Sequence, residues 1–238
     1  MIATTLRWFR SAPNSWRAHF PSFSKWTTVQ TSSFLATRPD AKPSLRRRSA
    51  SECFFGFPAA AGVRDGALIR YVIIKKQKTM LGESGGISTP RIGRLQTMFA
   101  DVGFPTNIST DIGGWMLGHS AFVVPIGFAL YRFGSDPTAL AADASTLRLM
   151  VRATREAFEA LEDVEIPANL RWLYLRMPMA YAVRYWRRVF ASPRGDLWFG
   201  AHSRAAPDEM HALAYELLAA VLRTGRQTPN LDALLGTR

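Results

Sequence analysis

The longest uncharged stretch of the chain constrains its fold more than any other feature. Residues 112–131 contain no Asp, Glu, Lys or Arg, although the chain has 30 Lys or Arg and 18 Asp or Glu residues. A run of about 20 apolar residues is long enough to cross the hydrocarbon core of a bilayer. Three structures therefore compete for this run: a membrane span, a buried central helix, or the wall of an active site.

The composition of the run favours a buried central helix. It includes four glycines, one histidine, one serine and one proline, and no basic cluster flanks it, so it is less apolar than a typical span. A helix enclosed on all sides by other helices should be uncharged all round. Small side chains should also let neighbouring helices or a substrate approach closely, at Gly113, Gly114, Gly118 and Ala121.

The net charge of +12 is concentrated in the first part of the chain. Residues 1–50 have nine Lys or Arg and one acid, which leaves only +4 for the rest. We expect residues 1–53 to be a disordered or non-native leader, with a transit peptide and an RNA-binding arm as successive alternatives. The remaining sequence is typical of a globular, cytoplasmic protein, and we predict neither a nucleic-acid partner nor a membrane partner.

Cysteine and histidine usage argues against a disulfide and a metal centre. Cys53 is the single cysteine, which excludes an internal disulfide. The four histidines, His19, His119, His202 and His211, show no spacing typical of metal ligands. We therefore expect no metal.

Residues 54–106 show a strand, a loop and a helix in that order. Residues 67–74 are β-branched and aromatic, which predicts a strand. The segment LGESGGISTPR follows, and its GESGG matches neither common phosphate-binding glycine motif, so a flexible surface turn is expected. A helix should begin at Pro90, bury one face and end before Gly103. The expected apolar face comprises Ile92, Leu95, Met98 and Phe99.

Residues 107–238 are predicted to be almost entirely helical. The first helix should start at Asp111, capped by Ser109 or Thr110, and contain the uncharged run. Further helices are expected over residues 137–163, 169–189 with a break at Met177-Pro178, and 207–224. The second of these four helices should bury Leu140, Leu147, Met150, Val151, Phe158 and Leu161 and expose RATRE, and the third should have an aromatic face of Tyr174, Tyr181, Tyr185 and Trp186.

Three ordered segments carry a resemblance to a known family. They are FGFPAAAGVRDGALIRYVI, TMLGESGGISTPRIGRLQTMFADVGFPTNISTDIGGWMLGHSAFVVPIGFALY and DEMHALAYELLAAVLRTGRQTPNLD. Together they resemble the ketopantoate reductase (2-dehydropantoate 2-reductase) family, particularly its divergent bacterial members, over residues 54–236. The resemblance implies an α+β chain in which residues 54–106 are a remnant of a Rossmann-type nucleotide-binding domain and residues 107–238 are an all-α helical substrate domain.

The resemblance also implies a reaction. Members of the family use NADPH to reduce the ketone of a 2-keto acid such as 2-dehydropantoate. A lysine early in the central helix, in a W-x-K pattern, donates the proton and stabilises the developing alkoxide. An acid at the start of the final helix and a serine shortly before it bind the substrate.

The family pattern is only partly present in this sequence. The tryptophan is Trp115, but Leu117 occupies the lysine position and can neither donate a proton nor stabilise an oxyanion. His119 lies about 200° further round the helix and cannot simply replace the lysine. The acid is Glu209, for which a substrate role and a helix-terminus role are equally expected. The serine is Ser192, for which a plain turn role is favoured, so no catalytic residue is assigned.

The nucleotide-binding part departs further from the family. A complete domain needs about 100 to 150 residues before this point, and the sequence contains no G-x-G. NADPH is thus the cofactor implied by the resemblance, while its site is expected to be absent. We predict a truncated, catalytically impaired reductase-like oxidoreductase. The alternative is a non-catalytic helical binding module that forms a homodimer through helices such as residues 169–189.

Overall fold

A computed structural model describes residues 54–57, 59–65, 68–73, 78–83, 86–205 and 207–237. Within these residues the chain separates into two compact units, one of residues 54–60 and 71–112 and another of residues 61–70 and 113–237. The predictions for the leader, including His19 and Cys53, and for Ser84 and Gly85 of the glycine-rich loop lie outside the described residues.

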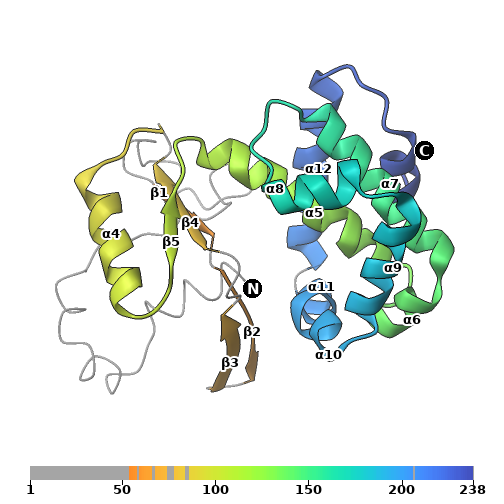
Figure 1. The fold of residues 1–238 in the computed structure, drawn as a ribbon, viewed down its shortest axis with the longest axis horizontal. Helices are drawn as coiled ribbons and strands as arrows, with labels where there is room; N and C mark the ends of the chain where they lie inside the picture. The colour runs from red at the N-terminus through yellow and green to blue at the C-terminus, as the bar shows by residue number, and fades with distance from the viewer. Residues whose placement is uncertain are drawn as a thin grey trace. The chain divides into compact units, whose positions relative to one another are not determined.

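The first unit contains a three-stranded sheet with one helix. The strands β1 (Phe54–Phe57), β4 (Thr79–Glu83) and β5 (Thr106–Ile108) pair in the order β1-β4-β5. β1 is antiparallel to β4, and β5 is parallel to it (Figure 1). The connection between the parallel strands is α4 (Pro90–Asp101), so β4, α4 and β5 form a βαβ unit.

The predicted strand and helix before residue 106 are confirmed. The strand is β3 (Leu68–Ile73), which pairs with β2 (Ala60–Asp65) in a separate two-stranded sheet. α4 starts with Pro90 and buries Ile92 and Leu95 in a core that also includes Phe54 and Leu81. Gly103, just beyond α4, has a φ of 79°, which glycine adopts without steric cost.

The expectation of a surface turn at GESGG is wrong for its first two residues. Gly82 and Glu83 belong to β4, every residue of which is buried. A Cβ at Gly82 would lie 2.5 Å from Ile112 Cβ, so glycine is required there by close packing rather than by a turn. A glycine required for packing inside a strand therefore resembles, in sequence, a glycine of a loop.

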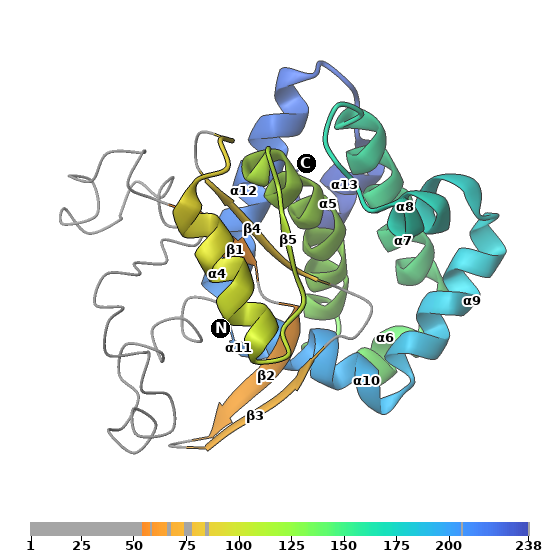
Figure 2. The ribbon, with the colours of Figure 1, turned by 60° about the vertical axis from the view of Figure 1, so that its left-hand side comes forward.

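Apart from residues 61–70, which include parts of β2 and β3, the second unit is helical, and α5 lies in its middle (Figure 2). Its elements are α5 (Ile112–Tyr131), α6 (Pro137–Ala142), α7 (Ala144–Ala160), α8 (Ala168–Arg171), the π-helical turn η3 (Trp172–Arg176), α9 (Met179–Phe190), α10 (Pro193–Gly195), the π-helical turn η4 (Asp196–Gly200), α11 (Ala201–Ala205), α12 (Pro207–Arg223) and α13 (Pro229–Leu235).

Burial explains why α5 has no charged residue. α5 is the one described helix that is long and apolar enough to cross a membrane, and 61% of its most apolar window is buried inside the protein. Two of its glycines allow close packing: a Cβ at Gly118 would lie 2.8 Å from the carbonyl oxygen of Glu165, and one at Gly127 would lie 2.9 Å from Met210 Sδ. The predicted role of small residues is thus observed at Gly118, while Gly127 was not predicted.

The predicted helix over residues 137–163 is wrong as a continuous element. It divides into α6 and α7 at Asp143, which ends one helix and caps the next. Asp143 Oδ1 accepts hydrogen bonds from Thr146 N and Ser145 Oγ, both at 2.6 Å. The six predicted core residues are all buried, whereas Ala153 and Thr154 of the RATRE segment, predicted to face solvent, are fully buried as well.

The remaining predicted helices are present near their expected boundaries, and the structure also contains short elements that were not predicted. The break at Met177-Pro178 is present, because α8 and η3 precede it and α9 follows. The predicted aromatic face is divided: Tyr174 and Trp186 are buried, while Tyr181 and Tyr185 are exposed. The helix predicted from Pro207 is α12. The short elements α10, η4, α11 and α13 had no recognisable periodic signal.

Candidate functional site

The first turns of α5 hold the position that the family pattern assigns to a proton donor. Trp115 is buried, and Leu117 is half-buried. The side chain of Leu117 is a hydrocarbon, so this position has no ionisable group and no hydrogen-bond donor. Chemistry at this end of the unit must therefore depend on neighbouring side chains.

His119 is the only titratable side chain in the first half of α5. Its ring stacks on Trp115, with centroids 5.4 Å apart and planes 9° from parallel, and meets Phe122 edge-on at 6.1 Å. Burial, reinforced by repulsion from His202, lowers the pKa of His119 to about 4. The imidazole of His119 is therefore neutral at pH 7, where it acts as a hydrogen-bonding group and not as a cation.

α11 brings a second histidine to the same region. Tyr131 OH at the end of α5 donates a hydrogen bond of 3.3 Å to the carbonyl oxygen of Ser203, which fixes α11 against α5. The pKa of the adjacent His202 is lowered by burial and raised in part by the carboxylate of Glu209. His202 thus lies within electrostatic range of both His119 and Glu209.

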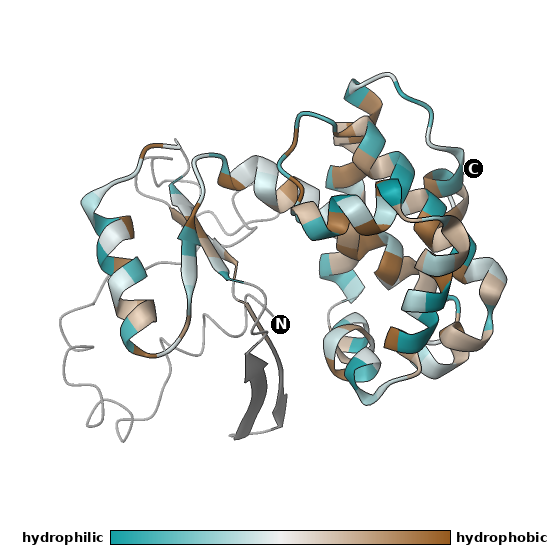
Figure 3. Ribbon diagram, in the orientation of Figure 1, coloured by the Kyte–Doolittle hydropathy of each residue, from teal (hydrophilic) through white to brown (hydrophobic). Residues whose placement is uncertain are grey.

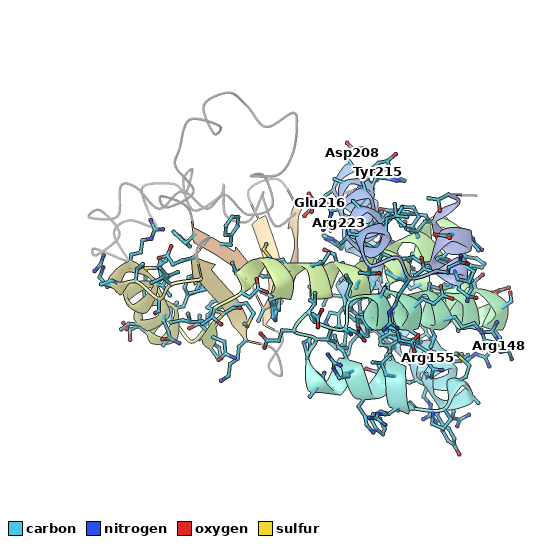
Figure 4. The ribbon with its side chains drawn as sticks, turned by 90° about the horizontal axis from the view of Figure 1, so that it is seen from above. Arg148, Arg155, Asp208, Tyr215, Glu216 and Arg223 are labelled. Atoms are coloured by element: carbon cyan, nitrogen blue, oxygen red, sulfur yellow. The ribbon has the colours of Figure 1, made fainter. Side chains whose placement is uncertain are left out.

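Glu209 and Asp208 lie in the first turn of α12, where a carboxylate is favoured by the helix dipole. Asp208 is labelled on α12 in Figure 4. Burial, followed by these two carboxylates, raises the pKa of Tyr131. His211, one turn further, stacks on Tyr131 with centroids 6.0 Å apart and planes 14° from parallel. Glu209 therefore acts electrostatically on groups of α5 and α11 as well as on its own helix.

We call the group formed by His119, Tyr131, His202 and Glu209 the α5–α11–α12 junction. Within the described part of the chain no three His, Cys, Asp or Glu side chains are grouped so that they could hold a metal ion. Burial lowers the pKa of both imidazoles, and the Glu209 carboxylate acts against that shift at His202. The junction thus combines two imidazoles, a phenol and a carboxylate. Such a set is suited to binding a polar, uncharged group and to exchanging a proton with it.

Ser192, the other predicted substrate-binding residue, lies at the end of a helix. It immediately precedes α10, and its Oγ donates a 2.7 Å hydrogen bond to the carbonyl oxygen of Val189 in α9. The hydroxyl is therefore engaged at the helix end, as expected for a turn residue. Its assignment to substrate binding stays a prediction.

The first unit has a charged group where β4 ends. The Glu83 carboxylate accepts hydrogen bonds from Thr89 Oγ1 and from Arg91, whose Nε lies 2.8 Å from Oε1. Pairing with Arg91 lowers the pKa of Glu83 despite its burial. Beyond it, a Cβ at Gly86 would lie 2.4 Å from the carbonyl oxygen of Thr110. The described residues at the end of β4 therefore either pack against their neighbours or belong to the ion pair between Glu83 and Arg91.

Of the four residues of this junction, Glu209 was predicted from the sequence, His119 was set aside as a replacement for the lysine, and His202 and Tyr131 were missed. His202 is 83 residues from His119, and neither shares a spacing pattern with Glu209. His202 could not be recognised because α11, the helix that carries it, is only five residues long. The tertiary fold alone brings these groups to one place.

Comparison with solved structures identifies the fold. The chain is similar to a ketopantoate reductase from Ralstonia solanacearum MolK2 (TM-score 0.57, 18% identity), over 80% of this chain and 55% of that one. It is also similar to 2-dehydropantoate 2-reductase from Geobacter metallireducens GS-15 (TM-score 0.54, 15% identity), over 78% of this chain and 60% of that one. A D-mandelate dehydrogenase with NADH and anilino(oxo)acetate matches with a TM-score of 0.52 at 11% identity, over 78% of this chain and 58% of that one.

These comparisons confirm the predicted resemblance at the level of the fold: part of a Rossmann-type α/β domain followed by a helical domain. The chain spans a little over half the length of these solved structures. No family model matches the sequence, and no curated protein matches it significantly.

Proposed function

We propose that this chain is a cytoplasmic ketopantoate reductase-like oxidoreductase whose helical unit binds a 2-keto acid such as 2-dehydropantoate and whose catalytic power is impaired. The observation that carries the proposal is the shared fold together with Glu209 in the first turn of α12, beside His202 and Tyr131. Glu209 occupies the position that the family resemblance assigns to substrate binding.

The chemistry of ketone reduction explains the proposed impairment. As hydride reaches the carbonyl carbon, negative charge develops on the oxygen, and a cationic proton donor close to it lowers the barrier. Leu117 supplies neither charge nor proton. His119 has a pKa of about 4, so only a small fraction of its imidazole is protonated at pH 7. A bound 2-keto acid would therefore be held without efficient protonation.

The described residues do not fit a pyrophosphate cradle. Glu83 places a buried carboxylate at the end of β4, and its partner Arg91 is already engaged in a two-pronged ion pair. Gly86 is packed on Thr110 rather than open to a ligand. A nicotinamide cofactor is therefore part of the proposal through the family resemblance alone, and no step is assigned to it.

The proposal predicts binding without turnover. In isothermal titration calorimetry the full chain should bind 2-dehydropantoate, and E209Q should weaken this binding at least about tenfold because a charge-assisted hydrogen bond is lost. D208N is the matched control, because it removes the neighbouring carboxylate of the same helical turn. Equal effects of the two substitutions would indicate a general electrostatic effect and contradict the substrate role of Glu209.

A second assay tests the impairment. Mixed with NADPH and 2-dehydropantoate, the full chain should show no substrate-dependent loss of absorbance from the reduced nicotinamide. Turnover by the unmodified chain would refute the impairment. Absence of 2-dehydropantoate binding would instead favour the alternative, a non-catalytic helical binding module with the same fold.

A further inference from the structure

The outer face of α9 has no partner among the described residues. α9 packs its inner face against α6 and α7 through Ala182, Val183, Trp186 and Phe190. The opposite face presents Tyr181, Arg184, Tyr185 and Arg188, which follow the spacing i, i+3, i+4 and i+7 and are all exposed. We call these four residues the Tyr–Arg stripe. Strongly hydrophilic and hydrophobic segments alternate along α9, as expected for a two-faced helix (Figure 3).

The stripe lies within a segment of one charge sign. Residues 166–195 contain six arginines and no acid, whereas the other residues of 113–238 contain eight arginines and twelve acids. The helical unit is therefore electrically divided, with +6 on this segment and −4 on the remainder. In the described part of the chain none of these six arginines forms an ion pair. They are Arg171, Arg176, Arg184, Arg187, Arg188 and Arg194.

The aromatic members of the stripe are unusually exposed. Tyr181 is 65% exposed and Tyr185 is 45% exposed. Tyrosine and arginine are the residue types enriched among the energetic anchors of protein interfaces, because each offers a large contact area and a polar end. A guanidinium also pairs with carboxylates through two parallel hydrogen bonds. The Tyr–Arg stripe thus combines two tyrosines that can pack against a partner with two arginines that favour an acidic surface.

We propose that the Tyr–Arg stripe of α9 docks an acidic segment of a partner protein, whose carboxylates pair with Arg184 and Arg188 while Tyr181 and Tyr185 pack between them. Along the helix axis Arg184 and Arg188 are one turn, about 6 Å, apart. Asp or Glu residues one turn apart on a partner helix have the same spacing, so both guanidinium groups can be engaged at once.

Charge argues against two other occupants. In a symmetric dimer through α9 the same patch would face itself and bring four guanidinium groups together. This geometry disfavours a homodimer through residues 169–189, which the sequence offered as an alternative. For a nucleic acid the stripe is short, about 10 Å from Tyr181 to Arg188. It would contact only a few phosphates, beside a remainder of the unit that repels them.

Fluorescence anisotropy with the full chain tests the proposal. The probe is a fluorescein-labelled synthetic helical peptide with pairs of glutamates one turn apart on one face. R184E/R188E should weaken peptide binding at least about tenfold, since two charge-assisted contacts become repulsive. The control is R148E/R152E on α7, which makes the same charge change at the same i, i+4 spacing on two exposed arginines. Arg148 is labelled in Figure 4. This control should retain binding within about twofold, because exposed charges elsewhere are screened by salt.

A second variant separates anchoring from charge. Y181A/Y185A keeps every arginine and should still weaken the peptide at least about fivefold, because the aromatic anchors are lost. Circular dichroism should show unchanged helicity in all three variants. The proposal is overturned if the peptide does not bind, if R148E/R152E weakens it as much as R184E/R188E, if oligo-dT binds more tightly than the peptide, or if R184E/R188E abolishes self-association measured by sedimentation velocity.

Discussion

The carboxylate of Glu156 on α7 caps the N-terminus of α13 in place of a residue of α13 itself. Glu156 Oε2 accepts hydrogen bonds from Asn230 N at 2.8 Å and from Leu231 N at 3.0 Å, and Oε1 accepts one from Asn230 Nδ2. Thr228, which precedes α13, makes no capping hydrogen bond with its side chain. The N-terminus of the last helix is therefore capped by a side chain from 74 residues earlier in the sequence.

We expect E156A to lower the free energy of unfolding by about 2 kcal/mol, because two backbone donors at a helix N-terminus lose a charged acceptor. Urea denaturation followed by circular dichroism measures this loss. E159A, an exposed acid on the same helix, is the matched control and should change stability by less than about 0.5 kcal/mol. Equal effects of the two substitutions would contradict the capping role.

His119 should make the helical unit sensitive to acid. Its folded pKa of about 4 lies below the ordinary value of 6.5, so the folded protein disfavours the imidazolium. The contribution of His119 to the free energy of unfolding is fully present above pH 6.5. It falls as the pH drops from 6.5 towards 4, because the unfolded chain binds a proton that the folded chain does not. Linkage gives a loss of the order of 3 kcal/mol, which arises first from the burial of His119 and then from repulsion by His202.

The measurement is thermal unfolding of the native chain and of H119F over this pH range. Phenylalanine keeps a ring stacked on Trp115 but cannot titrate, so the decline between pH 6.5 and 4 should be shallower in the variant. An NMR titration of the native chain provides the direct test. A His119 midpoint near 6.5 would show that the imidazole is not held in its neutral form.

The two packed glycines of α5 should respond differently to alanine. In a helix this substitution alone is stabilising by about 1 kcal/mol. A Cβ at Gly118 would meet the backbone oxygen of Glu165, which cannot move aside easily, whereas one at Gly127 would meet the flexible side chain of Met210. We expect G118A to be destabilising by about 1–3 kcal/mol and G127A to be close to neutral.

Thermal denaturation of both variants provides the comparison. G93A on α4 reports the intrinsic gain from alanine, because nothing lies within 4 Å of a Cβ at that position. If G118A proves as stable as G127A, the contact between α5 and the segment around Glu165 is looser than described.

Arg155 should hold the break before α9 in place. Its Nη2 donates a 2.5 Å hydrogen bond to the carbonyl oxygen of Met177, and its Nε donates another to the carbonyl oxygen of Tyr174. These carbonyls lie at the end of the π-helical turn η3, where intrahelical partners are lacking. R155M keeps the aliphatic stem and should cost about 2 kcal/mol of stability, measured by urea denaturation. R152M on the exposed face of α7 should cost much less, and a similar cost at both positions would contradict this role.

Much of the helical unit could be predicted from local signals. Pro90 and Gly103 marked α4, Pro207 and Gly225 marked α12, and Met177-Pro178 marked the start of α9. These signals act within one turn of the residue that carries them, through a fixed φ, a missing donor or a left-handed conformation. A signal of the same kind was missed at Asp143. Its side chain caps a new helix inside a segment whose apolar residues keep a helical period throughout.

The candidate site was only half predictable. Glu209 and Leu117 were found because a family pattern gave them positions, while His202 and Tyr131 lay outside any pattern. Ser192 was proposed from its place in the chain, and its hydroxyl is engaged with the carbonyl oxygen of Val189. A hydroxyl or an imidazole has no periodic signature, so its role depends on which neighbours the fold supplies.

By itself the sequence determined that residues 112–131 form an uncharged helix suited to burial, because a charged side chain on any face of a fully enclosed helix would lose its hydration without compensation. Only the tertiary structure decided which groups meet around that helix. The proximity of His119 to His202, and of Glu156 to Asn230, arises from the packing of helices distant in sequence. Such proximity is set by the burial of whole helix faces and not by the local preferences of the residues that meet.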